Sequence, residues 1–304
     1  MTWFFIALGA PFLWALTNIS DQYLVTKFSS RERGSGALVL FSSLIGIFVA
    51  ILIGIFTTDI FSVALSDKLL LILTGGITIA WVIFYLFALE IEDVSTVVAW
   101  FLTLPIFGYI LSFIFLNETL TTQQAIGSLI VLFGVFLVSI DYAGEKRKLK
   151  LRPALYMLIA CLLLATSGII FKHVTVGNNF WVSSFWEYVG LGLSGLLIYF
   201  LVPKYRREFL SMNKIGGGKI FTLNTVSEIL TILGNLLTNY ALLLAPVAMI
   251  YLVSSFQPAI VLILTILTTK LFPNVVKENL KKEVLVPKII ALGVMLIGSF
   301  VLFI

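Results

Sequence analysis

The chain has 304 residues, of which 60% are hydrophobic and only 12% are charged, with a net charge of +5. Soluble domains carry roughly 25% charged residues, and the mean hydropathy of +1.10 also excludes a soluble enzyme or a nucleic-acid-binding domain. Cys161 is the single cysteine and His173 the single histidine, which excludes an intramolecular disulfide and a cysteine- or histidine-based metal site. The sequence predicts no cofactor.

Apolar stretches long enough to cross a bilayer occupy nearly the whole chain. A membrane span needs roughly 20 mostly apolar residues. Ten stretches meet this length, and they predict an all-α integral membrane protein in contact with the lipid bilayer. The predicted spans are 3–25, 37–57, 69–89, 94–116, 123–141, 153–174, 180–202, 220–244, 247–269 and 286–304.

The basic residues lie almost entirely on one side of these spans. The loops after spans one, three, five, seven and nine hold 18 of the 20 Lys and Arg residues, and only Lys68 and Lys172 fall on the other side. Basic residues near span ends are retained in the cytoplasm, so we expect a multi-pass protein of the cell membrane with cytoplasmic basic loops and both termini outside. The positive charge then reflects sidedness and anionic lipid rather than a nucleic-acid partner.

The chain divides into two sets of five spans. We expect a first repeat over residues 1–141, a basic cytoplasmic linker over 142–152 and a second repeat over 153–304. At a constant offset of 153, residues 85–117 align without gaps to 238–270, and Pro105 falls on Pro258 in the middle of spans four and nine. Five is odd, so the second repeat must be inverted, as in secondary transporters that bind their substrate between repeats.

The segment 105–138 (PIFGYILSFIFLNETLTTQQAIGSLIVLFGVFLV) carries a mid-span proline, a Glu-Thr-Leu-Thr turn and two glycines seven residues apart. It resembles the signature of the drug/metabolite transporter superfamily, EamA type. The resemblance implies ten helices in two EamA repeats and a metabolite transporter. In the second repeat Leu271 stands in the place of Glu118, and Ala291 in the place of Gly127.

Span eight carries a polar stripe. Glu228, Thr231, Asn235 and Asn239 recur at helical spacing and therefore share one face. An acidic residue at mid-membrane costs roughly 2.5–3.5 kcal/mol, so this face must meet protein or water. We favour one wall of a substrate cavity, with interhelical hydrogen bonding as the alternative.

Two deep charges in neighbouring spans allow two interpretations. Glu187 lies in span seven and Lys172 near the end of span six, so an ion pair between them would make both residues structural. Unpaired, Glu187 is a candidate for proton or ion coupling together with Glu228.

Aromatic and amide side chains supply the other candidate substrate contacts. Those near span ends are typical interface anchors, but several lie deeper and are candidates for the cavity lining. They are Trp14 and Asn18 in span one, Trp81 and Tyr85 in span three, Trp100 in span four, and Tyr251 and Gln257 in span nine. Because proline frees a backbone carbonyl one turn earlier, Pro105 and Pro258 are expected to shape this lining.

Three further positions are predicted to be structural. Glu118 is expected to cap the start of span five through Thr121 or Thr122. Gly134 and Gly298 permit close packing of spans five and ten, and these peripheral spans are equally candidates for a homodimer contact.

Together these features predict a secondary active transporter for a small organic solute, with no enzymatic activity. Two acidic positions and one deep cation favour a zwitterionic or cationic substrate, such as an amino acid, over a phosphorylated one. The resemblance suggests export. The alternative is a membrane-embedded enzyme acting on a lipid-linked substrate, but the chain has no HExxH or DDxxD motif.

Overall fold

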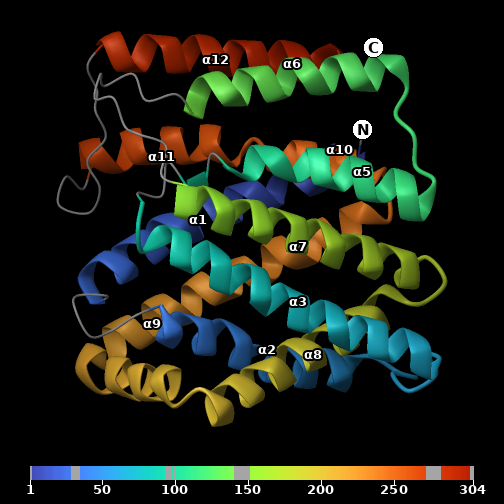
Figure 1. The fold of residues 1–304 in the computed structure, drawn as a ribbon, viewed down its shortest axis with the longest axis vertical. Coiled ribbons are helices and arrows are strands. Elements are labelled where there is room, and N and C mark those ends of the chain that lie inside the picture. Colours follow the sequence, from blue (N-terminus) through green and yellow to red (C-terminus); the bar gives the residue numbers. More distant parts are fainter. Residues whose placement is uncertain are drawn as a thin grey trace.

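The structure is a computed structural model that describes residues 2–28, 35–92, 97–98, 100–139, 151–271 and 282–301. Every regular element in these ranges is helical, as predicted, and Figure 1 shows the helices side by side along one direction. The elements are α1 (Thr2–Phe28), α2 (Gly36–Phe56), α3 (Leu65–Leu89), η1 (Trp100–Thr103), α5 (Leu104–Leu116), α6 (Thr122–Ser139), α7 (Leu151–Thr175), α8 (Phe180–Leu201), α9 (Pro203–Leu242), α10 (Val247–Ser254), α11 (Gln257–Leu271) and α12 (Lys282–Val301).

Six of these helical stretches are long and apolar enough to cross a membrane. They lie in α1, α2, α3, α7, α8 and the α10–α11 region, and shorter apolar helices occur at 100–116, 122–134 and 285–301. The multi-pass membrane protein predicted from the sequence is therefore confirmed. Residues 142–150 of the predicted linker lie outside the described ranges.

Two predicted spans are interrupted and one is extended. Span four is broken just before Pro105, and span nine just before Pro258, so that each proline occupies the second position of a new helix. A proline inside a continuous helix would remove a backbone hydrogen bond, whereas at the start of a helix it does not. Span eight extends backward, since α9 already begins at Pro203 and takes in the basic segment expected as a loop. Proline tolerates the first position of a helix, where its missing N–H has no intrahelical partner.

The element ends repeat the offset seen in the sequence. Helices α3 and α9 end at Leu89 and Leu242, and helices α5 and α11 begin at Leu104 and Gln257. Both pairs are 153 residues apart, the same offset that aligns Pro105 with Pro258.

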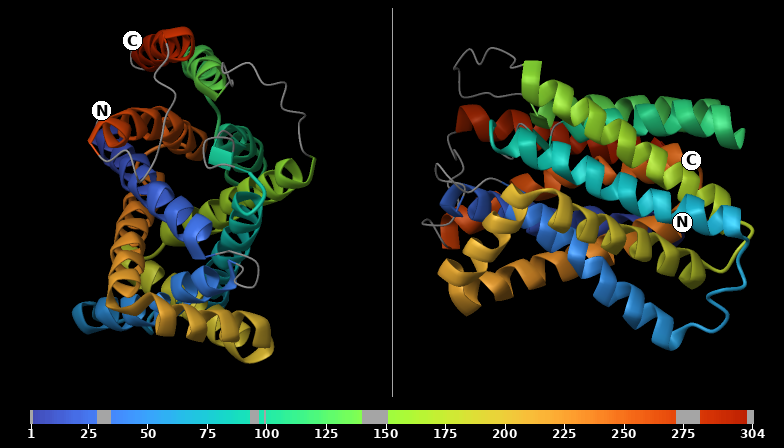
Figure 2. Two further views of the ribbon diagram at one scale, coloured as in Figure 1. Left: turned by 90° about the vertical axis from the view of Figure 1, so that its left-hand side faces the viewer. Right: turned by 60° about the horizontal axis from the view of Figure 1, so that its bottom comes forward.

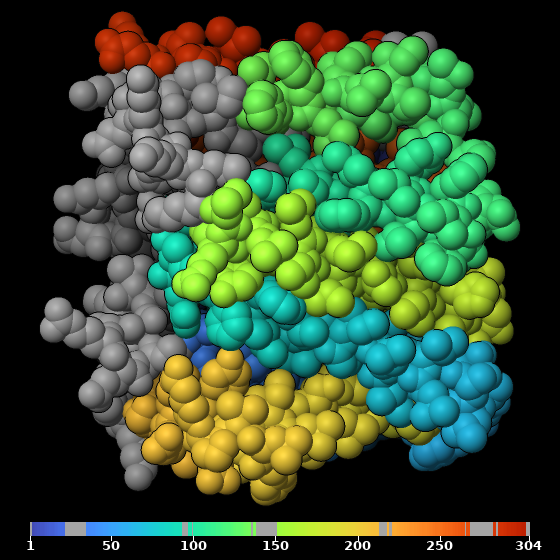
Figure 3. All heavy atoms as spheres, viewed as in Figure 1, coloured from blue at the N-terminus to red at the C-terminus, as the bar shows by residue number. Residues whose placement is uncertain are grey.

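Helices of the first half pack mainly on helices of the second half. The closely packed pairs are α1 with α9, α3 with α7, α2 with α8, and α6 with α12. Helix α3 also packs on α8, and α2 on α9, so neither half forms a separate unit. Figure 3 shows side chains filling the space between α5, α7 and α3 on the face viewed.

Helices α6 and α12 form a separate pair at one end of the bundle (Figure 2). A Cβ on Gly134 would lie 2.9 Å from the backbone nitrogen of Met295, and one on Gly298 would lie 2.7 Å from that of Val131. Both glycines thus permit close packing within one chain, as expected of small residues between membrane helices.

The bundle has two edges. One edge lies at the left of Figure 1, where α1, α3 and α8 end and α2, α7 and α9 begin. Three basic residues at the starts of α7 and α9 are exposed: Arg152, Lys204 and Arg207. We call this the basic edge. Helices α2, α5, α7 and α9 end at the opposite edge.

Candidate functional site

A cavity lies among α1, α2, α3, α8 and α9, and reaches the broken helices η1–α5 and α10–α11. It lies toward the basic edge, and the space between its lining atoms, open solvent included, is about 1080 Å³. Its polar lining residues are Trp14, Thr17, Asn18, Asp21, Ser42, Thr78, Trp81, Tyr85, Tyr188, Glu228, Thr231, Asn235, Ser254 and Gln257.

Glu228 is the carboxylate that α9 presents to this cavity. The hydroxyl of Ser42 on α2 donates a hydrogen bond to its Oε1 atom. Asp21 on α1 lines the same cavity. Ser42 gives Glu228 a neutral donor rather than a positive charge, and Glu228 and Asp21 together place two carboxyl groups in the wall of this cavity.

The polar stripe of span eight faces this cavity over two turns. Glu228, Thr231 and Asn235 all line it. Thr231 also donates to the carbonyl of Ser227 at 3.0 Å and contacts the hydroxyl of Thr17 at 3.4 Å. The residues of the stripe therefore line the cavity and also make contacts between helices, because α1 lies directly against α9 here.

Helices α1 and α3 contribute further donors and aromatic rings to the cavity lining. Tyr85 donates to Oδ1 of Asn18 at 3.1 Å, and the rings of Trp81 and Tyr85 lie 6.2 Å apart. The indole N–H of Trp81 and the amide nitrogen of Asn18 are buried without a hydrogen-bond partner among the described residues. Buried donors without partners are costly, and these two are available to a polar solute.

A second cavity lies next to the first, toward the opposite edge, and shares part of its lining with it. Glu187 of α8 lines it, and Nδ2 of Asn239 on α9 donates to Oε2 of Glu187 at 2.8 Å. Tyr251 closes its far wall, where its hydroxyl donates to the carbonyl of Leu164. Eight residues line both cavities: Trp14, Thr78, Trp81, Leu104, Leu164, Tyr188, Leu191 and Asn235.

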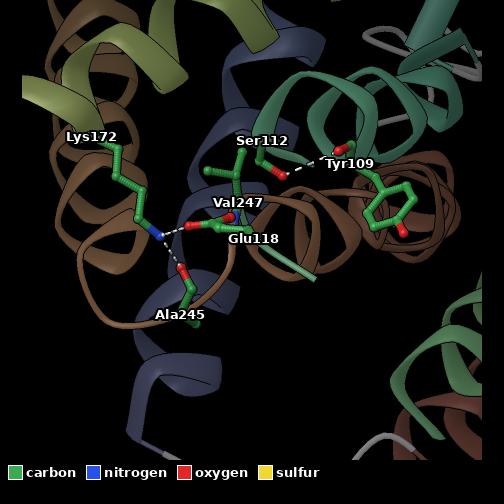
Figure 4. A network of polar contacts seen from close by, with 6 residues as sticks. All are labelled: Tyr109, Ser112, Glu118, Lys172, Ala245 and Val247. Carbon is green, nitrogen blue, oxygen red and sulfur yellow. Dashed lines mark hydrogen bonds and ion pairs between the residues drawn. The ribbon is translucent and has the colours of Figure 1, made fainter. Parts of the chain in front are cut away.

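The predicted ion pair between Lys172 and Glu187 is wrong. Nζ of Lys172 lies 2.5 Å from Oε1 of Glu118 and donates to the carbonyl of Ala245 at 2.7 Å (Figure 4). The other oxygen of Glu118 accepts the backbone N–H of Val247 at 2.7 Å. Lys172 therefore joins α7 to the turn after α5 and to the loop between α9 and α10.

This junction also corrects the expected cap of span five. Thr121 and Gln124 cap the helix reciprocally: the Thr121 N–H donates to Oε1 of Gln124, and the Gln124 N–H donates to Oγ1 of Thr121. Glu118 is turned away by Asn117, which ends α5 in the left-handed conformation at φ 53°.

Most of the predicted substrate contacts line one of the two cavities. Trp14, Asn18, Trp81, Tyr85, Glu228, Thr231, Asn235 and Gln257 line the first, and Asn239 and Tyr251 the second. Trp100 lines neither; it begins η1, packs against the core, and its carbonyl accepts the Thr103 hydroxyl. The coupling candidates Glu187 and Glu228 lie in different cavities.

Several lining residues were absent from the prediction. Asp21 falls three residues after Asn18 on the predicted polar face of span one, so the helical spacing indicated it. Ser42 and Tyr188 gave no such signal, because one hydroxyl in an apolar span and one ring beside an acidic residue are both common.

Residues 1–140 match the model of the EamA-like transporter family. The match confirms the predicted resemblance to the drug/metabolite transporter superfamily and supports a membrane transporter. A solved crystal structure is similar over 99% of this chain and 96% of its own chain, with a TM-score of 0.70 and 16% identity. At this identity the likeness shows the fold. A comparison with curated proteins found no match.

Proposed function

We propose that the chain is a secondary active transporter that moves a small cationic or zwitterionic metabolite, such as an amino acid or an amine, out of the cell by alternating access. The observation that carries the substrate class is the charge of the cavities. Asp21, Glu187 and Glu228 line them, whereas no Lys, Arg or His lines either one among the described residues. An anionic solute would meet repulsion here, and a phosphorylated one needs basic partners.

The proposed mechanism uses two inverted five-helix repeats, residues 1–141 and 153–304. Supporting it are the element ends that recur at an offset of 153 and the reciprocal packing of α1 on α9 and α3 on α7. Both broken helices meet the first cavity, as expected of discontinuous helices at a transport site. Rocking of one repeat against the other would expose the cavity to each edge in turn, with the basic edge in the cytoplasm.

Glu228 would hold the ammonium group of the solute, or a proton in its absence, and Trp81 and Tyr85 would hold its organic body. A proton and a cation that compete for one carboxylate exchange with each other across the membrane. Glu187 would be the second coupling site.

A binding assay on the purified protein in mild detergent tests this function. We would measure thermal stabilisation by amino acids and amines for the wild type and for Glu228→Gln, which keeps an acceptor for the Ser42 hydroxyl. A ligand at 100 times its Kd stabilises by about 2.7 kcal/mol. We expect stabilisation by cations that is lost in Glu228→Gln and unchanged in Glu283→Gln, an exposed acid on α12. Equal stabilisation of both variants would contradict the role of Glu228.

A further inference from the structure

The two neighbouring cavities share eight lining residues and hold carboxyl groups at two different levels of the bundle. Glu228 lies in the cavity toward the basic edge, and Glu187 in the cavity toward the opposite edge. We propose that the site binds an elongated organic dication, one end at Glu228 and the other at Glu187. The proposal rests on the function proposed above and specifies its substrate class.

The distance between the two carboxylates follows from α9. The side chain of Asn239 contacts Glu187 at 2.8 Å, so the position of Asn239 along α9 also gives the position of Glu187. Asn239 follows Glu228 by 239 − 228 = 11 residues in one uninterrupted helix. At a rise of 1.5 Å per residue the two levels are roughly 16 Å apart. One amino-acid ammonium group cannot contact both levels.

The wall between the two carboxylates is mostly apolar and aromatic. Of the eight residues that line both cavities, two are polar without a ring, Thr78 and Asn235, and the others are Trp14, Trp81, Tyr188, Leu104, Leu164 and Leu191. A chain of methylene groups gains affinity from burial against such side chains, and a cationic group is attracted to the faces of the rings. The lining therefore suits a linear molecule with an apolar middle and two positive ends.

Among the described residues, Glu228 and Glu187 receive neutral donors. Ser42 donates to Glu228, and Asn239 donates to Glu187. Lys172, the described lysine nearest in sequence to Glu187, is engaged by Glu118 and Ala245. A monoamine at Glu228 would leave Glu187 without a cationic partner, which is unfavourable for a carboxylate in a mostly apolar wall. A dication would pair with both Glu228 and Glu187, and Asp21 would remain as the third carboxyl group of the lining.

The separation sets the length of the ligand. An extended chain gains roughly 1.2 Å per bond, as an extended backbone does. Each ammonium group stops roughly 2.8 Å short of its carboxylate oxygen, so roughly 8 to 10 bonds between the terminal nitrogens fit. Linear diamines with a long methylene chain have this form.

The test is a homologous series of α,ω-diamines, compared with monoamines of the same chain length. Affinities are measured by titration calorimetry on the purified full-length protein in mild detergent. We expect the diamine affinity to rise with length to an optimum near roughly 8 to 10 bonds between the nitrogens, at least tenfold above that of the matched monoamine.

Variants assign the two ends. In Glu187→Gln the amide oxygen still accepts from Asn239, so the fold is preserved while the charge is lost. We expect this variant to bind diamine and monoamine equally, with the monoamine affinity of the wild type. Glu228→Gln should weaken both ligands at least tenfold, and Glu283→Gln neither.

The outcomes separate the two proposals. Equal affinity for diamines and monoamines in the wild type, with binding still dependent on Glu228, overturns the dication site and leaves the proposed function standing. An optimum at short diamines also overturns it, because such a ligand cannot reach Glu187. If no amine or amino acid binds in a Glu228-dependent way, both proposals fail.

Discussion

Glu118 and Glu187 are both carboxylates held among apolar helices, but their surroundings differ. Glu118 has a full set of partners within the protein: Lys172 at 2.5 Å and the backbone N–H of Val247 at 2.7 Å. Glu187 has the neutral amide of Asn239 and a cavity in front of it. The first arrangement fixes helices relative to one another, whereas the second leaves a negative charge that a solute can neutralise.

The Glu118–Lys172 junction also joins the first half of the chain to the second. The Glu118–Lys172 junction, at the opposite edge, joins the turn after α5 to α7 and to the α9–α10 loop. At an offset of 153 the place of Glu118 is taken by Leu271. The second half therefore has a leucine at the position where the first half has the carboxylate of this junction.

Loss of the ion pair should give the largest effect on stability. We expect Glu118→Gln to lower the free energy of unfolding by about 3 kcal/mol, at the low end of the range of roughly 3–5 kcal/mol for breaking a buried pair. The low end applies because the side chains of Lys172 and Glu118 are 12% and 16% exposed. Thermal unfolding in detergent without ligand measures this loss of stability. The double variant Glu118→Gln/Lys172→Met removes the unpaired charge and should regain part of the loss. A wild-type melting temperature for Glu118→Gln would show that the junction does not hold the edge together.

Close packing of α3 on α8 should give the next largest effect. A Cβ on Gly75 would overlap the backbone of α8 at Glu187 and Leu191 and lie 2.6 Å from the carbonyl carbon of Gly190. Gly75→Ala must push the helices apart, at a cost of about 1–3 kcal/mol, and move Glu187 away from Asn239. The adjacent variant Gly76→Ala is the matched control, because its Cβ meets only the hydroxyl of Ser194 at 3.3 Å. Unfolding measurements should separate the two; equal stability would mean that α3 and α8 do not pack this tightly.

The membrane fold was predictable because its signals are local. The lengths of the apolar stretches predicted the membrane spans, and Pro105 and Pro258 marked the two places where helices break. The polar spacing of Glu228, Thr231 and Asn235 gave one wall of the cavity. Each of these patterns lies within one helix.

The partners of the charges were not predictable in the same way. Sequence proximity suggested Glu187 for Lys172, but the actual partner, Glu118, lies in the other half of the chain. Which helices face each other depends on packing that one sequence does not display. Asn117, directly before Glu118, ends α5 in the left-handed conformation, a local detail that was not predicted from the sequence.

A smaller effect is expected at the true cap of α6. Thr121→Ala removes one of two reciprocal hydrogen bonds with Gln124 at an exposed helix end and should cost about 1 kcal/mol. Thr121→Ser keeps the hydroxyl and should stay within a few tenths of a kcal/mol of the wild type. The difference in melting temperature between the two variants measures the cap alone. If both variants lose equal stability, the methyl group of Thr121 matters rather than its hydrogen bond.

The smallest effect on stability should come from the cavity carboxylates, which is the sharpest contrast with Glu118. In Glu228→Gln the amide oxygen still accepts from Ser42, and the variant removes a negative charge that the protein itself does not neutralise with a cation. Removing a buried charge without a counter-charge relieves an unfavourable term, so we expect unfolding without ligand to change by less than about 1 kcal/mol and to shift toward greater stability. Glu187→Gln should behave alike, because Asn239 keeps its acceptor. Both variants would be melted beside Glu118→Gln, in the same detergent. If Glu228→Gln unfolds as readily as Glu118→Gln, the Glu228 carboxylate has a cationic partner in the folded chain, and its place in the cavity serves the fold rather than a solute.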